Sequence, residues 1–219
     1  MLVSVVMDYA LSSRDGLADE LLAAGPDAPT LCEGWEARHL AAHLLLREHS
    51  VWAAGIIGGP LRRGMERRLE ALADEANTPA AFARLVSRFR AGPGKISPLR
   101  SARIDNAANV IEYFVHTEDV RRARDRWAPR ALETGYEEKL WQLLIQRAGM
   151  MYSGAGVGVI LVRADGRRSR VARGADSVAI FGETGELVMH ANGRTEHALV
   201  SFEGSPEVVA KMRAFQAHV

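Results

Sequence analysis

The hydrophobic residues of this chain change their spacing near residue 150, and this change is the strongest constraint on the fold. Before that point apolar residues recur at intervals of three and four, the pattern of helices that bury one face. From Gly156 onward the sequence breaks into short apolar runs separated by turn residues such as Asp165-Gly166, which is typical of strands. We therefore predict an α+β protein with two domains, a helical bundle over residues 1–150 and a small α+β domain over residues 151–219.

Apolar periodicity and Gly/Pro breakers predict the elements within each domain. Thr78 and Pro79 have the residue types of an N-cap and a first helical position. The predicted helices of the first domain cover residues 2–24, 36–57, 65–76, 79–91, 104–124 and 133–150. The second domain is predicted to contain strands over 156–163, 169–174, 177–182 and 197–204, with helices over 182–194 and 206–218.

Composition excludes several classes of partner. The 28 basic and 27 acidic residues of the 219-residue chain leave a net charge of +1, so no global charge attracts nucleic acid or an anionic membrane. No stretch approaches the ~18–20 apolar residues of a membrane span. The single cysteine cannot form an internal disulfide, and no secretory signal opens the sequence. A cytoplasmic location is therefore predicted.

The stretch IEYFVHTED carries the most informative chemistry. Glu112 and His116 are four residues apart, so a helix places them on one face with Cβ atoms roughly 5–6 Å apart. Asp119, three residues further on, can accept a hydrogen bond from the histidine ring or act as another ligand. His43 lies among alanines and leucines of the second predicted helix. Three such ligands from two helices would leave an open coordination position, as catalytic metal sites do.

Other interpretations of these residues remain open from spacing alone. Glu112 and His116 can form an intrahelical hydrogen-bonded pair without any metal. His39 and His43 are also four residues apart, so a two-histidine site on the second helix is a competing geometry. Cys32 is interpreted as a small packing residue. The charged side chains that follow His116 are predicted to form a solvated face with weak ion pairs: Glu118, Arg121, Arg122 and Arg124.

Two motifs occur in order and at a suitable separation: W-x-x-x-x-L-x-x-H within PTLCEGWEARHLAAHLLLREH, and E-x-x-x-H-x-x-D within IEYFVHTED. Together they resemble the mycothiol-dependent maleylpyruvate isomerase N-terminal family, and an actinobacterial branch of it in particular. That family belongs to the DinB-like group of metal-binding four-helix bundles. The tail VAIFGETGELVMHANGRTEHALVSFEGSPEVVAKM is similar to the C-terminal α+β domain that accompanies the bundle in those proteins.

The resemblance implies a set of site residues. It places the metal ligands at His43, Glu112 and His116, and it implies zinc, although nickel, cobalt or iron would also suit the ligand types. His39 stands where family members commonly have an acidic residue, so it is a further candidate ligand. An arginine of the C-terminal domain assists catalysis in the isomerase, and the resemblance assigns that role to Arg194.

The predicted function is a divalent-metal-dependent thiol transferase or isomerase with mycothiol as co-substrate. A bound cation lowers the pKa of a thiol, and the thiolate then attacks an electrophilic small molecule. The alternative is a non-catalytic module that binds metal or a small ligand, and a metal-free helical scaffold is a third interpretation. A homodimer is compatible with the sequence, and the oligomeric state stays open.

Overall fold

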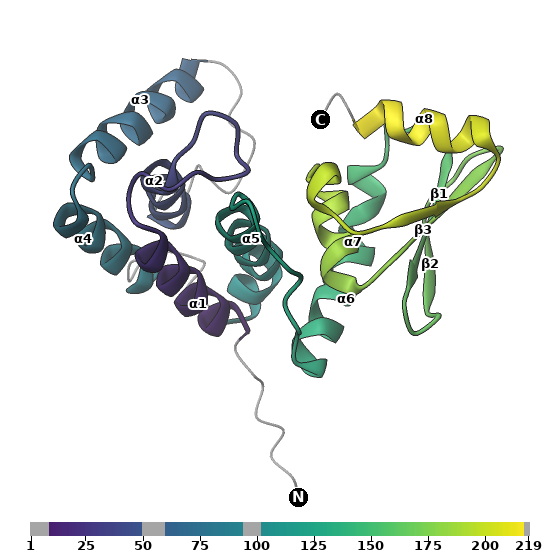
Figure 1. Ribbon diagram of the computed structural model, residues 1–219, viewed down its shortest axis with the longest axis horizontal. Helices are drawn as coiled ribbons and strands as arrows, with labels where there is room; N and C mark the ends of the chain where they lie inside the picture. Colours follow the sequence, from purple (N-terminus) through teal and green to yellow (C-terminus); the bar gives the residue numbers. More distant parts are fainter. Residues whose placement is uncertain (1–8, 50–59, 94–101, 217–219) are drawn as a thin grey trace, which may run out of the picture. The chain divides into compact units, whose positions relative to one another are not determined.

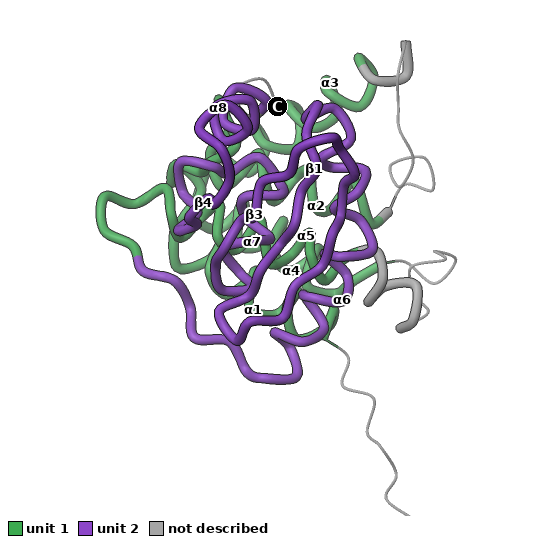
Figure 2. Tube along the Cα trace, turned by 90° about the vertical axis from the view of Figure 1, so that its right-hand side faces the viewer, with its two compact units in different colours: residues 1–127 green, residues 128–219 purple. Residues whose placement is uncertain are grey.

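The computed structural model describes residues 9–49, 60–93 and 102–216. Within these residues it contains eight α-helices and one four-stranded sheet, which confirms the predicted α+β class (Figure 1). The chain forms two compact units, residues 1–127 and 128–219 (Figure 2). None of the helices in the described ranges has the length and apolar character needed to span a membrane.

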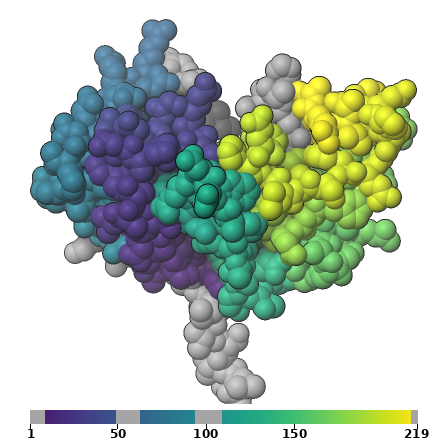
Figure 3. All heavy atoms as spheres, viewed as in Figure 1, coloured from purple at the N-terminus to yellow at the C-terminus, as the bar shows by residue number. Residues whose placement is uncertain are grey.

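The regular elements in the described part of unit 1 are all helices, apart from one isolated β-bridge between Pro29 and Glu36. Helix α1 contacts α4 and α5, and α2 contacts α3 and α4. Figure 3 shows α1, in purple, beside α5, in teal. The bounds of the helices are α1 Tyr9–Ala24, α2 Ala37–His49, α3 Pro60–Glu75, α4 Pro79–Arg90 and α5 Ala102–Arg122.

Every helix of unit 1 contributes apolar residues to the interior, and Leu17, Leu40 and Phe82 are examples. Removing these side chains from water is the main favourable contribution to folding. The predicted N-cap of α4 is confirmed, because Thr78 Oγ1 accepts a hydrogen bond from the backbone N–H of Ala81 at 3.3 Å. That bond satisfies one of the amide groups that a helix start leaves unpaired.

The prediction of a solvated charged face after His116 is wrong for two of its residues. Glu118 is fully buried, and its carboxylate accepts a hydrogen bond from the buried Arg122 guanidinium at 2.6 Å. The guanidinium also lies 4.5 Å from the centre of the Trp127 ring. Pairing and ring contact together compensate for the loss of hydration, which is why these charges can lie inside the protein. Arg124 is exposed, as predicted.

Unit 2 is a four-stranded sheet with helices packed against it. Helix α7 contacts α6, β1 and β3, while α6 also contacts β2. The strand order is β2-β1-β3-β4, with β1 and β3 parallel and both outer pairs antiparallel. The bounds are α6 Thr134–Met151, β1 Gly158–Arg163, β2 Arg168–Ala172, β3 Ser177–Gly182, α7 Thr184–Ala191, β4 Ser201–Glu203 and α8 Pro206–Gln216.

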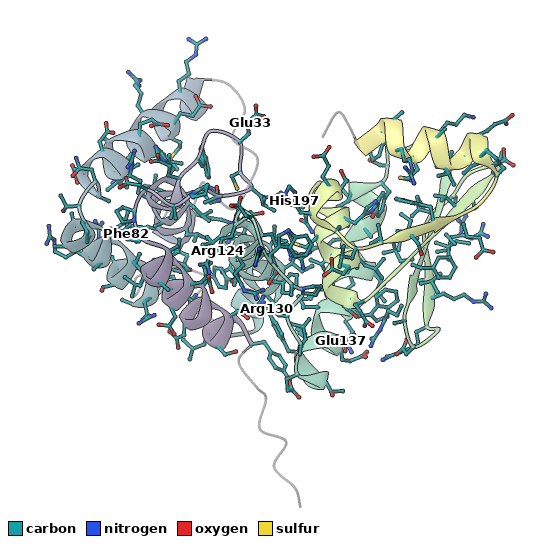
Figure 4. All side chains as sticks on the ribbon, in the orientation of Figure 1. Glu33, Phe82, Arg124, Arg130, Glu137 and His197 are labelled. Carbon is teal, nitrogen blue, oxygen red and sulfur yellow. The ribbon has the colours of Figure 1, made fainter. Side chains whose placement is uncertain are left out.

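A charged cluster joins α6 to the sheet within unit 2. The buried guanidinium of Arg163, at the end of β1, lies 3.1 Å from Glu137 and 3.2 Å from Glu138 of α6. Glu137, labelled in Figure 4, also accepts a hydrogen bond from the hydroxyl of Thr184 at 2.8 Å. Because Thr184 is the first residue of α7, this cluster fixes two helices and one strand together.

One strand boundary differs from the sequence-based prediction for an identifiable reason. The strand expected over 197–204 is wrong for its first half, since a 3₁₀ turn covers Thr195–His197 and β4 begins only at Ser201. The backbone N–H of Leu199 instead donates a hydrogen bond to the side chain of Glu186 on α7 at 2.7 Å. It therefore does not pair with a neighbouring strand. Parts of the first two predicted helices, 2–8 and 50–57, lie outside the described residues.

The division into compact units lies at residues 127 and 128, upstream of the predicted domain boundary at 150. Helix α6 accounts for the difference, because it packs on α7 and β2 and so belongs to unit 2 by its contacts. The change in hydrophobic period marks where strands begin, and β1 does begin at Gly158. The domain boundary at residue 150 stays a prediction.

Gly174 is expected to be intolerant of a side chain. A Cβ atom at this position would lie 2.2 Å from the backbone nitrogen of Gly158 and 2.7 Å from the carbonyl carbon of Val157. Gly174→Ala should therefore lower the free energy of unfolding by about 1–3 kcal/mol, as overpacking usually does, measured by urea denaturation. The control is Gly16→Ala on α1, where no atom of the described residues lies within 4 Å of the added Cβ and a gain of ~0.5–1 kcal/mol is expected. Equal stability of Gly174→Ala and the parent chain would contradict this packing.

Candidate metal centre

Helices α2 and α5 bring together the three side chains that the sequence proposed as metal ligands. Glu112 Oε1 lies 3.2 Å from His116 Nε2 and 3.4 Å from His43 Nε2. The ligand atoms of all three residues lie within 4.8 Å of one another. His43 and His116 approach edge to face, with ring centres 5.4 Å apart. The two rings and the carboxylate therefore converge on one point.

The separations match those required around a single cation. Ligand atoms about 2.0–2.1 Å from a tetrahedral ion lie roughly 3.3–3.4 Å from one another along the edges of the tetrahedron. The two contacts of Glu112 Oε1, at 3.2 and 3.4 Å, are close to these values. Two imidazole nitrogens and one carboxylate oxygen form a donor set that zinc and other first-row divalent ions accept. The residues present thus fit a divalent metal.

Asp119 fixes the orientation of the His116 ring. Its Oδ2 atom lies 2.9 Å from His116 Nδ1, and the aspartate is completely buried. When Nδ1 donates its proton to this carboxylate, the lone pair of the neutral ring is on Nε2, which faces Glu112. A carboxylate behind a histidine is the usual support of a metal-ligating imidazole. The sequence-based assignment of Asp119 as a partner of His116 agrees with this geometry.

Arg47 contacts Glu112, and Trp35 lies beside His43. The Nε atom of Arg47, one turn after His43 on α2, lies 3.1 Å from Glu112 Oε1. The same guanidinium donates a hydrogen bond to the side chain of Asn109 on α5. The ring of Trp35 lies 5.3 Å from that of His43, measured between centres. These contacts restrict the rotamers of the carboxylate and of the imidazole.

The electrostatics of the cluster favour charge separation between Glu112 and His116. Burial by itself raises the pKa of Glu112, but hydrogen bonds from His116 and His43 hold that pKa well below its ordinary value. Burial likewise lowers the pKa of His116, whereas its bonds to Asp119 and Glu112 bring the pKa well above its ordinary value. A carboxylate beside an imidazolium is the result, and a metal ion that binds here must displace the imidazolium proton.

His39 does not join the cluster, so the competing two-histidine geometry on α2 is not the one the structure adopts. Its Nδ1 atom accepts a hydrogen bond from the backbone N–H of Glu36 at 3.2 Å. Its Nε2 atom lies 3.6 Å from a carboxylate oxygen of Glu70 on α3. His39 is therefore directed toward α3 and caps the start of its own helix.

Cys32 lies closer to the cluster than the sequence indicated. Its thiol donates a hydrogen bond to Asp119 Oδ2 at 3.3 Å, so it contacts the carboxylate that holds His116. The two residues are 87 positions apart, and no local spacing pattern connects them. The only available signal was the position of Cys32 just before the motif that begins at Trp35. The interpretation of Cys32 as packing alone therefore missed a polar contact at the site.

Arg194 belongs to unit 2, where it follows the C-terminal end of α7. Its backbone N–H donates to the carbonyl of Met189 at 3.0 Å, and its guanidinium donates to the carbonyl of Asn192 at 2.7 Å. The side chain is half-buried. These contacts fix the turn in which Arg194 lies, and its catalytic role stays a prediction.

Comparison with protein families now distinguishes this bundle from other helical bundles. Residues 10–150 match the family described as the mycothiol maleylpyruvate isomerase N-terminal domain. The chain belongs to this family. The match includes both ligand-bearing helices and confirms the family that the two sequence motifs indicated.

Solved structures show that the likeness to the family's fold extends beyond the matched domain. Two crystal structures of the mycothiol-dependent maleylpyruvate isomerase, one of them of a mutant, are similar to this chain at TM-scores of 0.55 and 0.53. Their sequence identities are 18% and 17%, and each comparison covers 89% of this chain and 90% of the other. A search of curated proteins found no match.

Proposed function

We propose that this protein is a divalent-metal-dependent enzyme of the maleylpyruvate isomerase type, acting as a thiol isomerase or transferase with mycothiol as co-substrate. The observation that carries the proposal is the convergence of His43, Glu112 and His116 within 4.8 Å in a member of this family. These three residues would hold the metal, with zinc as the expected ion. Membership of the family supports the choice of mycothiol.

The residues around the ligands have roles that follow from their contacts. Asp119 keeps the Nδ1 proton of His116, so that Nε2 presents its lone pair. The Nε atom of Arg47 lies 3.1 Å from Glu112 Oε1, and its positive charge adds to the hydrogen bonds from His116 and His43 that keep this carboxylate ionised. A divalent cation bound by such a set lowers the pKa of a coordinated thiol and so supplies a thiolate at neutral pH.

The proposed reaction requires no cysteine of the protein as nucleophile. In isomerisation the thiolate sulfur bonds to one carbon of an electrophilic double bond, and the electron pair moves onto the conjugated carbonyl. Rotation about the resulting single bond and expulsion of the sulfur then restore both the double bond and the thiol. Arg194 is proposed to bind the substrate carboxylate through paired hydrogen bonds from its guanidinium.

Thiol binding to the metal-substituted protein tests this function directly. We expect cobalt-loaded protein to develop a sulfur-to-cobalt charge-transfer band when a low-molecular-weight thiol such as mycothiol is added. The experiment uses a Cys32→Ser background, so that the protein's own thiol cannot contribute the band. The same protein, loaded with zinc, should isomerise maleylpyruvate only when the thiol is present.

His39→Ala is the matched control for His43→Ala, because both residues lie on α2 and only His43 faces the cluster. His39→Ala should retain the band and the reaction, whereas His43→Ala should lose both. A cobalt-loaded protein whose spectrum does not respond to thiol would contradict the enzyme proposal. That result would support the alternative of a non-catalytic metal-binding module.

A further inference from the structure

A second group of ligand atoms lies on the opposite edge of the His116 ring. Asp119 Oδ2 is 2.9 Å from His116 Nδ1 and 3.3 Å from the sulfur of Cys32. One ligand atom from each of these three residues lies within 4.8 Å of the others. The ring therefore stands between two candidate cation positions, one at each nitrogen.

The loop that carries Cys32 is held against the end of α5 by backbone and side-chain hydrogen bonds. The N–H of Leu31 donates to the backbone carbonyl of Asp119 at 3.0 Å. Thr30 Oγ1 accepts from the N–H of Cys32 at 3.2 Å and donates to the carbonyl of Trp35 at 2.8 Å. Figure 4 labels Glu33, the next residue of this loop. The position of the thiol is thus fixed by the fold.

We propose that Cys32, Asp119 and His116 form a second, alternative cation site that selects thiophilic divalent ions such as Cd²⁺. A thiolate, a carboxylate and an imidazole nitrogen are a softer donor set than the two imidazoles and one carboxylate of the first position. Thiolate and carboxylate together carry two negative charges, which balance a divalent ion in this buried place. The thiol proton and the Nδ1 proton pass to solvent when the ion binds.

The two positions exclude one another through His116. A neutral imidazole has one lone-pair nitrogen, so Nε2 serves the first position only while Nδ1 keeps its proton. A cation at Nδ1 displaces that proton and leaves the ring's remaining proton on Nε2, so His116 no longer offers Nε2 as a ligand at the first position. One cation per chain is therefore expected, with its position set by the softness of the metal.

Access to the second position is from the Cys32 side. Asp119 is completely buried and His116 is nearly so, whereas Cys32 is only half-buried. The thiol is thus the group that an incoming ion meets first. A soft ion bound there would remove the ring nitrogen on which the proposed thiol chemistry depends, so Cd²⁺ would inhibit without occupying the first position.

Titration with Cd²⁺, followed by the ultraviolet charge-transfer band of a cadmium thiolate, tests the proposal. The full-length parent chain should show this band and reach its end point at one equivalent. His43→Ala should keep the band, because His43 is not part of the second site. Cys32→Ser should lose the band. Its Cd²⁺ affinity should fall by at least ~10–100-fold, because that is the usual loss when a residue that only supports a ligand is removed.

Two outcomes would overturn the second site. One is Cd²⁺ binding at one equivalent without a thiolate band, which would place the ion elsewhere. The other is loss of the band in His43→Ala, with folding intact by circular dichroism, which would make the thiol a ligand of the first position. Failure of the proposed enzymatic function appears differently, since the Cd²⁺ band of His43→Ala does not depend on thiol turnover.

Discussion

His116→Ala is expected to abolish tight binding of divalent metal. The ring contributes Nε2 to the cluster at 3.2 Å from Glu112 Oε1, and its Nδ1 atom is held by Asp119. Loss of a residue that merely supports a ligand costs about 10–100-fold in metal affinity, so loss of the ligand itself should cost more than ~100-fold. Competition titration with a chromophoric zinc chelator measures this change.

The matched control is His39→Ala, which removes a histidine from the same bundle without touching the cluster. Its zinc affinity should stay within about twofold of that of the parent chain, because residues that share no partner usually do not affect one another. Circular dichroism should show that His116→Ala keeps its helical content. Unchanged zinc affinity in a folded His116→Ala protein would remove the ring from the ligand set.

Arg14→Met is expected to produce the largest loss of stability. The guanidinium, nearly inaccessible on α1, lies 3.0 Å from Glu48 of α2 and 3.1 Å from the hydroxyl of Tyr113 on α5. The same hydroxyl donates a hydrogen bond to Glu48, so the three residues form one polar cluster between three helices. Removing one partner leaves the Glu48 charge buried without its counterion and should cost about 3–5 kcal/mol.

The thermal midpoint measured by circular dichroism should fall by roughly 6–20 °C, given ~2–4 °C per kcal/mol for a chain of this size. Arg14→Met combined with Glu48→Met should recover most of that loss, because two apolar side chains of similar length replace both charges. If the free energy of unfolding of Arg14→Met lies within about 1 kcal/mol of that of the parent chain, this ion pair is not required for stability.

The sequence predicted the part of the site that depends on local geometry. Glu112 and His116 are four residues apart, and a helix must bring such residues together, so this pair was accessible from spacing alone. His43 was a candidate from its apolar neighbours, but only the family resemblance selected it over competing geometries, because nothing local decides which face of α2 meets α5. For the same reason His39 remained a competing candidate until its contact with Glu70 was seen.

The features that the sequence could not provide all depend on tertiary contacts. The thiol of Cys32 meets Asp119 across 87 residues of chain. Glu118 and Arg122 have the residue types of a solvated helix face, but each is buried with a partner. The start of β4 is delayed because a side chain of α7 takes the backbone N–H of Leu199. In each case a specific distant partner overrides the local pattern.

Metal content per chain is the most direct test of the metal centre. Protein purified without an affinity tag should contain close to one equivalent of zinc or another divalent ion by mass spectrometry, because His43, Glu112 and His116 fit a single cation. A protein that contains no metal, and takes up none after incubation with zinc, would contradict this account. Glu112 and His116 would then be a buried hydrogen-bonded pair in a bundle that shares only its fold with the isomerase.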